Sequence, residues 1–357
     1  MTIILTPARL RLHSARSLPD RKQADNLRTM PWDERQWGTL QRRVHRDLLR
    51  AASPEPGWKV IVKAARRVLR TYSSSFFLVT RFLPAAKRAC VEVTYAAVRY
   101  PDEIADTFAL ATTRKLAMLR AWRESYLAAL DCRGFHECLE AGIPWILAGF
   151  AHVVTRHGIP REHYLAFLDA MERDIRPAPF ADFEELIGSY VYGSAIVVGY
   201  FLTYIYGADP PSASAEALDC ARELGIALQL TNFARDVEDD RLRGRLYVPV
   251  DWLAREGLTV TQALGPTHGA RLRRAARRLA MEAESRYQYA RRRLKTFSPD
   301  CRPAILACIE VYQAVNRRLL EGQGDAGRRV RLNALEKFRV LPPDKYWRVP
   351  LAYAGLL

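Results

Sequence analysis

Two stretches of the sequence each place two aspartates one helical turn apart. The first, RYPDEIADT, contains Asp102 and Asp106, and the second, LQLTNFARDVEDDRLRGRLYVP, contains Asp236 and Asp240. Residues four apart lie on the same face of a helix, where two like charges destabilise it by about a few tenths of a kcal/mol. Such a pair is typical either of an acidic turn exposed to solvent or of a helix face that a cation completes.

The second stretch favours a cation-binding helix face over an exposed acidic turn. Four side chains follow one line along a helix, at positions i, i+3, i+7 and i+11: Gln229, Asn232, Asp236 and Asp240. The residues between them are mostly apolar before Asp236, which predicts a mainly buried helix with a polar line that is costly unless cations complete it. Two such helices would form a pocket with four carboxylates. An all-oxygen site suits Mg²⁺, which keeps bound waters and binds through substrate phosphates. Arg245 and Tyr247 follow and can hold phosphate oxygens.

Other metal and nucleotide sites fit the sequence less well. None of the seven histidines has a glutamate three residues before it, as a di-iron helix bundle requires. Neither acidic stretch has the alternating acids, central glycine and distal glutamate of an EF-hand. The sequence contains no P-loop and no GxGxxG motif. Nucleotide binding therefore has no support from a motif.

The chain is long enough for a large core and is strongly basic. It has 357 residues, 49% hydrophobic content and a net charge of +16, and residues 271–348 carry 20 Lys/Arg against 8 Asp/Glu. A basic field attracts nucleic acid, acidic membrane surfaces or small polyanions such as diphosphates. The six cysteines form no CxxC pair, which favours reduced thiols in a reducing compartment.

The spacing of apolar residues predicts an all-α fold with one large helical domain. Apolar residues recur every three or four positions in seven segments, 58–72, 85–107, 112–131, 161–174, 213–238, 267–297 and 302–322. No alternating strand pattern and no internal repeat is present. We expect a basic, flexible extension over residues 1–55, with SPEPG at 53–57 as a linker. The catalytic domain then covers 56–340, and 341–357 forms a C-terminal tail.

Residues 186–208 contain no charged side chain and are long enough to span a membrane. Five tyrosines and four glycines spread along this segment favour a buried central helix instead. Its small residues, Gly193, Ser194, Ala195 and Gly199, would let a long apolar molecule lie against the backbone, or would serve close packing between helices.

At this point the sequence resembles the phytoene/squalene synthase family over residues 70–340. The first acidic motif of that family, R-x-x-D-[DE]-x-x-D, matches Arg99, Asp102, Glu103 and Asp106. The second, Q-x-x-N-x-x-x-D-x-x-x-D, matches Gln229, Asn232, Asp236 and Asp240, followed by G-R-x-Y as Gly244, Arg245 and Tyr247. The stretch YSSSFFLVTRFLP places Ser73, Ser75 and Phe76 in the family's Ser-x-Ser-Phe segment. Tyr190 begins a further helix motif, and Tyr312, with GRRVRL beyond it, matches the last helix.

The resemblance implies an isoprenoid-synthase fold whose central cavity lies between two facing acidic helices. It implies a prenyltransferase that condenses two C15 or C20 allylic diphosphates head to head through a cyclopropyl diphosphate. Asp102, Asp106, Asp236 and Asp240 would hold Mg²⁺, for which Mn²⁺ could substitute, against the diphosphates. Arg99 and Tyr190 would join them in catalysis. Substrate binding would fall to Ser73, Ser75, Phe76, Gln229, Asn232, Arg245, Tyr247 and Tyr312.

The product stays open at this stage. Two C20 substrates give phytoene for carotenoids, whereas two C15 substrates give squalene, which needs NADPH, or dehydrosqualene, which does not. Two observations favour phytoene: no nucleotide motif is present, and Thr80, one turn beyond Phe76, is small enough to leave a deep tunnel.

Readings from other classes explain less of the sequence. A chain-elongating or terpene synthase would carry DDxxD twice or N-D-x-x-S-x-x-x-E, and neither occurs. A decayed, non-enzymatic assembly factor of this fold would not keep both acidic motifs. A nucleic-acid-binding role would explain the basic charge but not four paired carboxylates. We expect a cytoplasmic enzyme with peripheral membrane contact, because its product is wholly apolar, and the sequence does not indicate its oligomeric state.

Overall fold

A computed structural model describes residues 32–51, 53–323, 329–354 and 356. The described chain is helical and contains no strand, only an isolated bridge between Ala208 and Phe297. The helices of the first half are α2 (Glu34–Leu49), α3 (Pro54–Tyr72), α4 (Ser74–Thr80), α5 (Ala85–Asp106), α6 (Thr112–Asp131), α7 (Phe135–Glu140), α8 (Trp145–His157) and α9 (Arg161–Ile175). Then follow α10 (Phe183–Leu186), the π-helix η1 (Ile187–Ile196), α11 (Val197–Tyr206), the short 3₁₀ turn η2 (Pro211–Ala213) and α12 (Ser214–Leu242). The last are α13 (Val250–Arg255), α14 (Val260–Leu264), α15 (Gly269–Arg292), the 3₁₀ turn η3 (Leu294–Thr296), α16 (Arg302–Leu320), α17 (Ala334–Val340) and α18 (Lys345–Tyr353).

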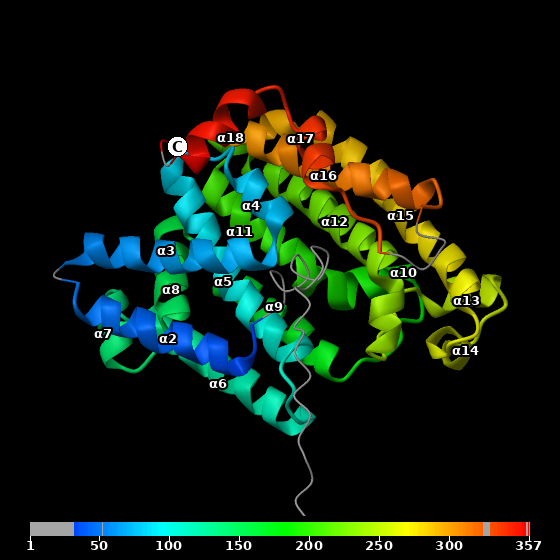
Figure 1. Cartoon of the computed structure of the whole chain (residues 1–357), viewed down its shortest axis with the longest axis horizontal. Coiled ribbons are helices and arrows are strands. Elements are labelled where there is room, and N and C mark those ends of the chain that lie inside the picture. Colours follow the sequence, from blue (N-terminus) through cyan, green and yellow to red (C-terminus); the bar gives the residue numbers. More distant parts are fainter. Residues whose placement is uncertain (1–31, 52, 324–328, 355, 357) are drawn as a thin grey trace, which may run out of the picture.

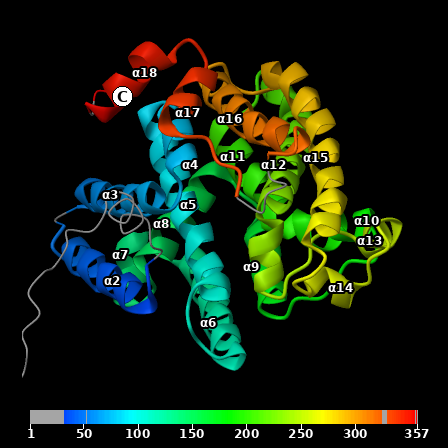
Figure 2. The ribbon, with the colours of Figure 1, turned by 45° about the vertical axis from the view of Figure 1, so that its right-hand side comes forward.

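The predicted all-α domain is confirmed, and all seven expected helices are present with ends shifted by a few residues. Helices from both halves of the chain surround a shared centre (Figures 1 and 2). On one side α5 packs against α3, α8 and α9, and on the other α12 packs against α11, α15 and α16. The two helices that carry the acidic motifs therefore belong to different halves of one core.

The N-terminal region is more ordered than the sequence led us to expect. Residues 34–49, which we assigned to a flexible extension, form α2, and its Trp37, Leu40, Val44 and Leu48 are buried. These residues recur at i, i+3, i+7 and i+11 and form the apolar stripe of a helix that packs on α3. Asp33 caps the helix by accepting a hydrogen bond from the Gln36 N–H at 2.7 Å. The rest of the expected extension, residues 1–31, lies outside the described residues.

The C-terminal tail likewise contains structure. Residues 345–353 form α18, and Nη1 of Arg348 donates to the carbonyl of Phe82 at 3.1 Å. In the preceding helix α17, Nζ of Lys337 donates to the Ser74 hydroxyl at 2.9 Å. The last two helices are therefore held against α4 and the segment that follows it.

The uncharged segment lies in the core, as the sequence indicates. By length and composition alone, Phe183–Tyr206 could cross a membrane, and half of its most apolar stretch is buried inside the protein. The helices η1 and α11 pack against α9 on one side and α12 on the other. Gly193 sits so close to α9 that an added Cβ would lie 2.4 Å from the carbonyl oxygen of Ala166.

Pro101 places a discontinuity inside α5, immediately before Asp102 of the first acidic motif. A proline has no N–H for the carbonyl of the residue four positions before it, here Ala97. That carbonyl instead accepts a 2.7 Å hydrogen bond from the hydroxyl of Tyr164 in α9, and this hydroxyl accepts another at 2.8 Å from Nε1 of Trp122. The carbonyl that the proline leaves without a helical hydrogen bond therefore links α5 to α9 and α6.

Candidate active site

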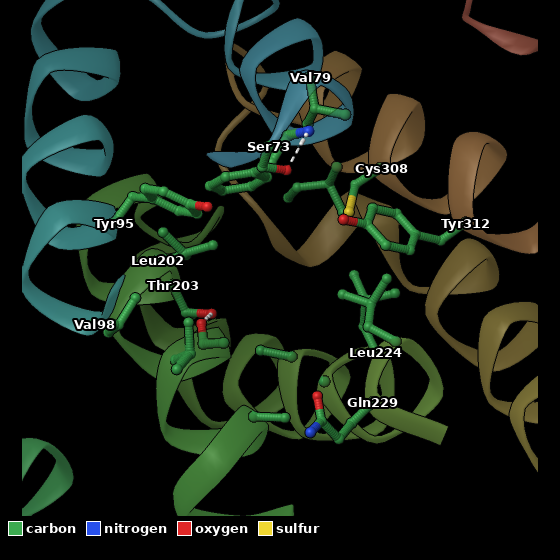
Figure 3. Close-up of a pocket in the computed structure, with 18 of the residues that line it drawn as sticks. Ser73, Val79, Tyr95, Val98, Leu202, Thr203, Leu224, Gln229, Cys308 and Tyr312 are labelled. Carbon is green, nitrogen blue, oxygen red and sulfur yellow. Dashed lines mark hydrogen bonds between the residues drawn. The ribbon is translucent and has the colours of Figure 1, made fainter. Parts of the chain in front are cut away.

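A cavity of about 310 Å³ lies between the two acidic helices. Tyr95 and Val98 of α5 face Leu224 and Gln229 of α12 across it (Figure 3). Its polar end carries Arg99, Asp102, Gln229 and Asn232, together with the hydroxyls of Ser73 and Tyr312. The remaining walls are mainly apolar and come from α4, α5, α11, α12 and α16: Phe76, Val79, Val98, Val198, Leu202, Leu224, Leu228, Ala304 and Ile305. This combination suits a molecule with a charged head and a long apolar tail.

The carboxylates of the first motif are paired with arginines from two parts of the chain. Nη1 of Arg99 bonds Asp102 and lies 3.2 Å from Oε1 of the buried Glu103. Asp106 accepts from Arg245, and Nη1 of Arg243 lies 3.4 Å from its other oxygen. The first acidic helix therefore meets the end of the second through arginines of the G-R-x-Y region.

The second motif differs at its two aspartates. Asp236 is held at 2.7 Å by both Nη2 of Arg235 and Nε of Arg329. Burial alone would raise the pKa of the Asp236 carboxyl, but the hydrogen bonds and charges of Arg235 and Arg329 lower it below its usual value. Asp240 has no ion pair within the described part of the chain. Burial, and next the charge of Asp236, raise its pKa to about 7.

The two motifs act on each other electrostatically. The charge of Asp106 contributes to the raised pKa of Asp240, while Arg243 and Arg245 oppose it. Burial raises the pKa of Asp102 as well, with Asp106 adding to the effect and Arg99 opposing it most strongly. Charges thus act across α5 and α12, but of the four aspartates only Asp102 lines the cavity, and a metal pocket of four carboxylates stays a prediction.

A further buried carboxylate, Asp174 at the end of α9, organises the G-R-x-Y region. It accepts hydrogen bonds from the hydroxyls of Tyr190 at 2.6 Å and Tyr247 at 2.7 Å. Its backbone carbonyl accepts from Nε and Nη2 of Arg245, at 3.2 and 3.1 Å. Burial raises the pKa of Asp174 to about 6, against the opposing charge of Arg245. Asp174 therefore positions the arginine that faces Asp106.

The structure places Tyr190 in this network rather than in the cavity. Its ring stacks on Tyr247 with centroids 5.1 Å apart, and Tyr247 stacks on Phe233 at 4.2 Å. Neither tyrosine lines this cavity, although we expected Tyr190 to act in catalysis and Tyr247 to bind substrate. Its hydroxyl is directed at Asp174.

The Ser-x-Ser-Phe segment contributes in part. Ser73 is the N-cap of α4, where its hydroxyl accepts from the Phe76 N–H at 3.2 Å, and it also lines the cavity. Phe76 lines the cavity and packs on Tyr95. Ser75 is not among the lining residues. Tyr312, from α16, lines the cavity opposite α5.

Thr80 does not lie where we expected. Its hydroxyl donates to the Phe77 carbonyl at 2.8 Å and accepts from Nη2 of Arg81 at 3.0 Å, and the side chain is fully buried. The lining residue of this turn is Val79. The tunnel-depth argument for a C20 substrate therefore loses its basis at Thr80. Among the small residues, Ser194, Ala195 and Gly199 do line the cavity, whereas Gly193 serves helix packing.

The donor set fits a divalent cation that is held jointly with a substrate. Among the described residues, no group of three or more His, Cys, Asp or Glu side chains can hold a metal by itself. Mg²⁺ is commonly bound by one or two carboxylates plus phosphate oxygens and water. Asp240 has no ion pair in the part of the chain that the structure describes, and burial raises the pKa of both Asp240 and Asp102, so a cation would stabilise the charge of these two carboxylates. Asp102, Asp106, Asp236 and Asp240 are the residues that would hold it.

Sequence reasoning missed Asp174, and it included Arg329 in GRRVRL without giving it a role. Asp174 continues the buried stripe of α9 formed by Tyr164, Phe167 and Met171, and a charge in such a stripe is the signal that could have found it. Arg329 lies 93 positions from Asp236, and only the fold brings the two together.

Comparison with known proteins decides the family. A family model described as squalene/phytoene synthase matches residues 69–336. The chain belongs to the squalene/phytoene synthase family. It is a prenyltransferase of the type that condenses two prenyl diphosphates head to head.

Relatives within this family carry two kinds of name. The chain is 30% identical to a 15-cis-phytoene synthase from a Paracoccus strain, over 75% of this chain and 85% of the relative. It is 34% identical to a presqualene diphosphate synthase from Zymomonas mobilis, over 60% of this chain and 69% of the relative. A solved dehydrosqualene synthase shares the fold, with a TM-score of 0.69 and 21% identity over 84% of this chain and all of that one.

Proposed function

We propose that this prenyltransferase joins two C20 geranylgeranyl diphosphates to form phytoene. The observation that carries the proposal is the apolar cavity, whose polar end lies between two coupled acidic helices. Relatives from several bacteria that match along most of their length are named phytoene synthase, which supports the C20 substrate.

The residues of the polar end would bind and orient the diphosphates. Arg99, Arg245 and Arg329 each pair with an aspartate in this structure. When a diphosphate binds, their guanidinium groups could pair with its phosphate oxygens instead. Ser73, Gln229, Asn232 and Tyr312 line the same end and supply neutral hydrogen bonds. These donors would stabilise the charge of a leaving diphosphate as its C–O bond breaks.

The four aspartates would hold the divalent cation, which we propose is Mg²⁺. When bound, it would supply Lewis-acid stabilisation of the departing diphosphate. The apolar walls would exclude water from the allylic cation left behind. Asp174 would keep Arg245 directed at Asp106 while the substrates change charge.

A second candidate is condensation of two C15 farnesyl diphosphates to presqualene diphosphate, squalene or dehydrosqualene. The relative named presqualene diphosphate synthase, at 34% identity, favours it. NADPH would be required only for squalene.

We place the enzyme in the cytoplasm.

A product assay separates the candidates. Purified protein would receive Mg²⁺ with either the C15 or the C20 diphosphate, with and without NADPH, and the products would be identified by mass spectrometry. Phytoene from the C20 substrate without reductant would support the proposal. If the enzyme converts the C15 diphosphate but not the C20 diphosphate, the second candidate function is correct instead.

The metal assignment needs its own variants. Asp102→Asn and Asp240→Asn should each lower kcat by at least about 100-fold, because an amide holds Mg²⁺ poorly, while helical content by circular dichroism stays unchanged. Asp251→Asn, on the partly exposed α13, is the matched control and should keep its activity. Near-parental rates for both site variants in the presence of EDTA would contradict the assignment.

A further inference from the structure

The last two helices present aromatic and aliphatic side chains to solvent. Nine large hydrophobic residues are exposed in the described chain, and four of them fall within residues 335–356. Leu335 is 57% exposed, Tyr346 71% and Trp347 47%. Such clustering in a short segment differs from the scattered exposed hydrophobics of an ordinary surface.

A ring contact joins the exposed side chains of α17 to those of α18. Leu335 and Phe338 lie three residues apart on α17, and the ring of Phe338 contacts that of Tyr346 with centroids 5.6 Å apart. On α18, Tyr346, Trp347 and Pro350 are all exposed, whereas Lys345 of the same helix is buried. We call Leu335, Phe338, Tyr346, Trp347 and Pro350 the C-terminal patch.

Positive charge borders the C-terminal patch. Arg331 and Arg339 are exposed, and neither has a carboxylate within ion-pair distance among the residues that the structure describes. The nearby acids are already paired, Glu336 with Arg318 at 2.8 Å and Asp344 with Arg348 at 3.3 Å. The border of the patch therefore keeps an excess of positive charge.

The patch lies over the elements that wall the apolar part of the cavity. Lys337 of α17 bonds Ser74 of α4, and Arg348 of α18 bonds the carbonyl of Phe82 just beyond it. Helix α17 also packs on α16, which contributes Ala304, Ile305 and Cys308 to the cavity. Figure 2 shows α18 projecting from the bundle beyond α17, at the end that α4 and α16 share.

We propose that the C-terminal patch docks this enzyme on an anionic lipid bilayer. Tyrosine and tryptophan suit the interface between headgroups and acyl chains, and unpaired arginines attract anionic headgroups. This inference rests on the proposed function in one respect, which is that a wholly apolar product must enter a bilayer. A second copy of the chain fits less well, because a symmetric contact would bring Arg331 and Arg339 of both copies together.

Vesicle binding tests the proposal without substrate. The parent should sediment with vesicles of phosphatidylcholine and phosphatidylglycerol, and less with phosphatidylcholine alone. The double variant Tyr346→Ser, Trp347→Ser should partition at least about tenfold less onto either vesicle. Arg331→Gln with Arg339→Gln should lose mainly the preference for the anionic lipid. Met281→Ser on α15, 61% exposed in the parent, is the matched control and should bind as the parent does.

Three results would overturn the proposal. The first is a parent that binds neither kind of vesicle. The second is a double variant that binds vesicles as the parent does. The third is a parent dimer, seen by light scattering, that the double variant converts to a monomer without any vesicle binding, since the patch would then join two copies. Activity assayed in detergent should be unchanged in every patch variant. A parent inactive in detergent would instead contradict the proposed function and leave the vesicle result intact.

Discussion

Glu92 lies at the centre of a buried ionic cluster that joins α3, the end of α4 and α5. Its carboxylate is fully buried, bonds Arg81, and accepts from Nε of Arg66 at 3.0 and 3.1 Å. Arg88 lies one turn before it on α5 and is 3% exposed, and its Nε and Nη1 have no hydrogen-bond partner among the described residues. Burial, and next the charge of Arg81, lower the pKa of Arg88 to about 10, so it stays charged at neutral pH. One carboxylate thus balances three guanidinium groups.

The change Glu92→Gln should therefore be costly. Breaking a buried ion pair by removing one partner costs about 3–5 kcal/mol, because the other charge stays buried without compensation. Arg81 and Arg88 are both buried and would lose the nearby carboxylate charge, whereas water relieves Arg66, whose side chain is 44% exposed. We expect the free energy of unfolding to fall by ~3–5 kcal/mol and the midpoint of thermal unfolding to fall on the order of 5–10 °C.

Urea unfolding followed by circular dichroism measures this loss. Glu55→Gln is the matched control, because Glu55 also pairs with a cation, Lys59, at 2.9 Å, but both side chains are more than 70% exposed. Exposed pairs of this kind contribute at most about 1 kcal/mol. Replacing Arg88 by Met in the Glu92→Gln background should recover at least about 1 kcal/mol, because one buried positive charge is removed.

Two outcomes would refute this reasoning. Glu92→Gln could lose no more stability than Glu55→Gln, which would mean that burial does not determine the cost. Alternatively, the Arg88→Met change could fail to restore any stability, which would mean that excess positive charge is not what destabilises the variant.

Three other predictions concern the site and its supports. Because the Asp240 carboxyl must lose its proton to bind a cation, and burial raises its pKa to about 7, the Mg²⁺ concentration for half-maximal activity should rise about tenfold per pH unit below pH 7 and stay level above it. Val79→Phe narrows the cavity and should lower the ratio of kcat/KM for the C20 over the C15 diphosphate at least about tenfold. Gly193→Ala should lower the free energy of unfolding by about 1–3 kcal/mol in urea, since its Cβ would lie 2.4 Å from a backbone oxygen.

Each of these has a discriminating result. A Mg²⁺ requirement independent of pH would show that Asp240 does not bind the cation as a carboxylate. If Val79→Phe leaves the ratio of kcat/KM for the C20 and C15 diphosphates unchanged, α4 does not determine the chain length of the substrate. Gly188→Ala is the control for Gly193→Ala, because a Cβ at Gly188 meets nothing within 4 Å, and equal losses for both would contradict the packing argument.

The long helices and the paired aspartates could be predicted because both depend on local spacing. Helices α5 and α12 follow from apolar residues at every third or fourth position, and their aspartates share a face by the same geometry. Helix α2 also has apolar residues at helical spacing, which are Trp37, Leu40, Val44 and Leu48. Its many arginines nevertheless led to the expectation of a flexible extension. A basic composition does not exclude a helix that buries one side.

The partners of the aspartates could not be predicted from spacing. Arg329 reaches Asp236 from a segment after α16, and Asp174 reaches Arg245 across 71 positions. Thr80 shows the limit of helix-face reasoning, because α4 has seven residues and Thr80 is its last. There, hydrogen bonds to Phe77 and Arg81 fix the direction of the side chain.

The π-helix η1 gives this fold an unusual way to vary. A π turn holds more residues than an α turn, so deleting one residue from 187–196 would let the segment return toward α-helical spacing. A deletion inside a regular α-helix would rotate the side chains beyond it by about 100°. Here the narrowing of a wide turn would offset that rotation, so that Val198 and Leu202 beyond η1 would keep facing the cavity. The chain can therefore lose a residue at this point while the cavity wall of α11 and the acidic helices keep their directions.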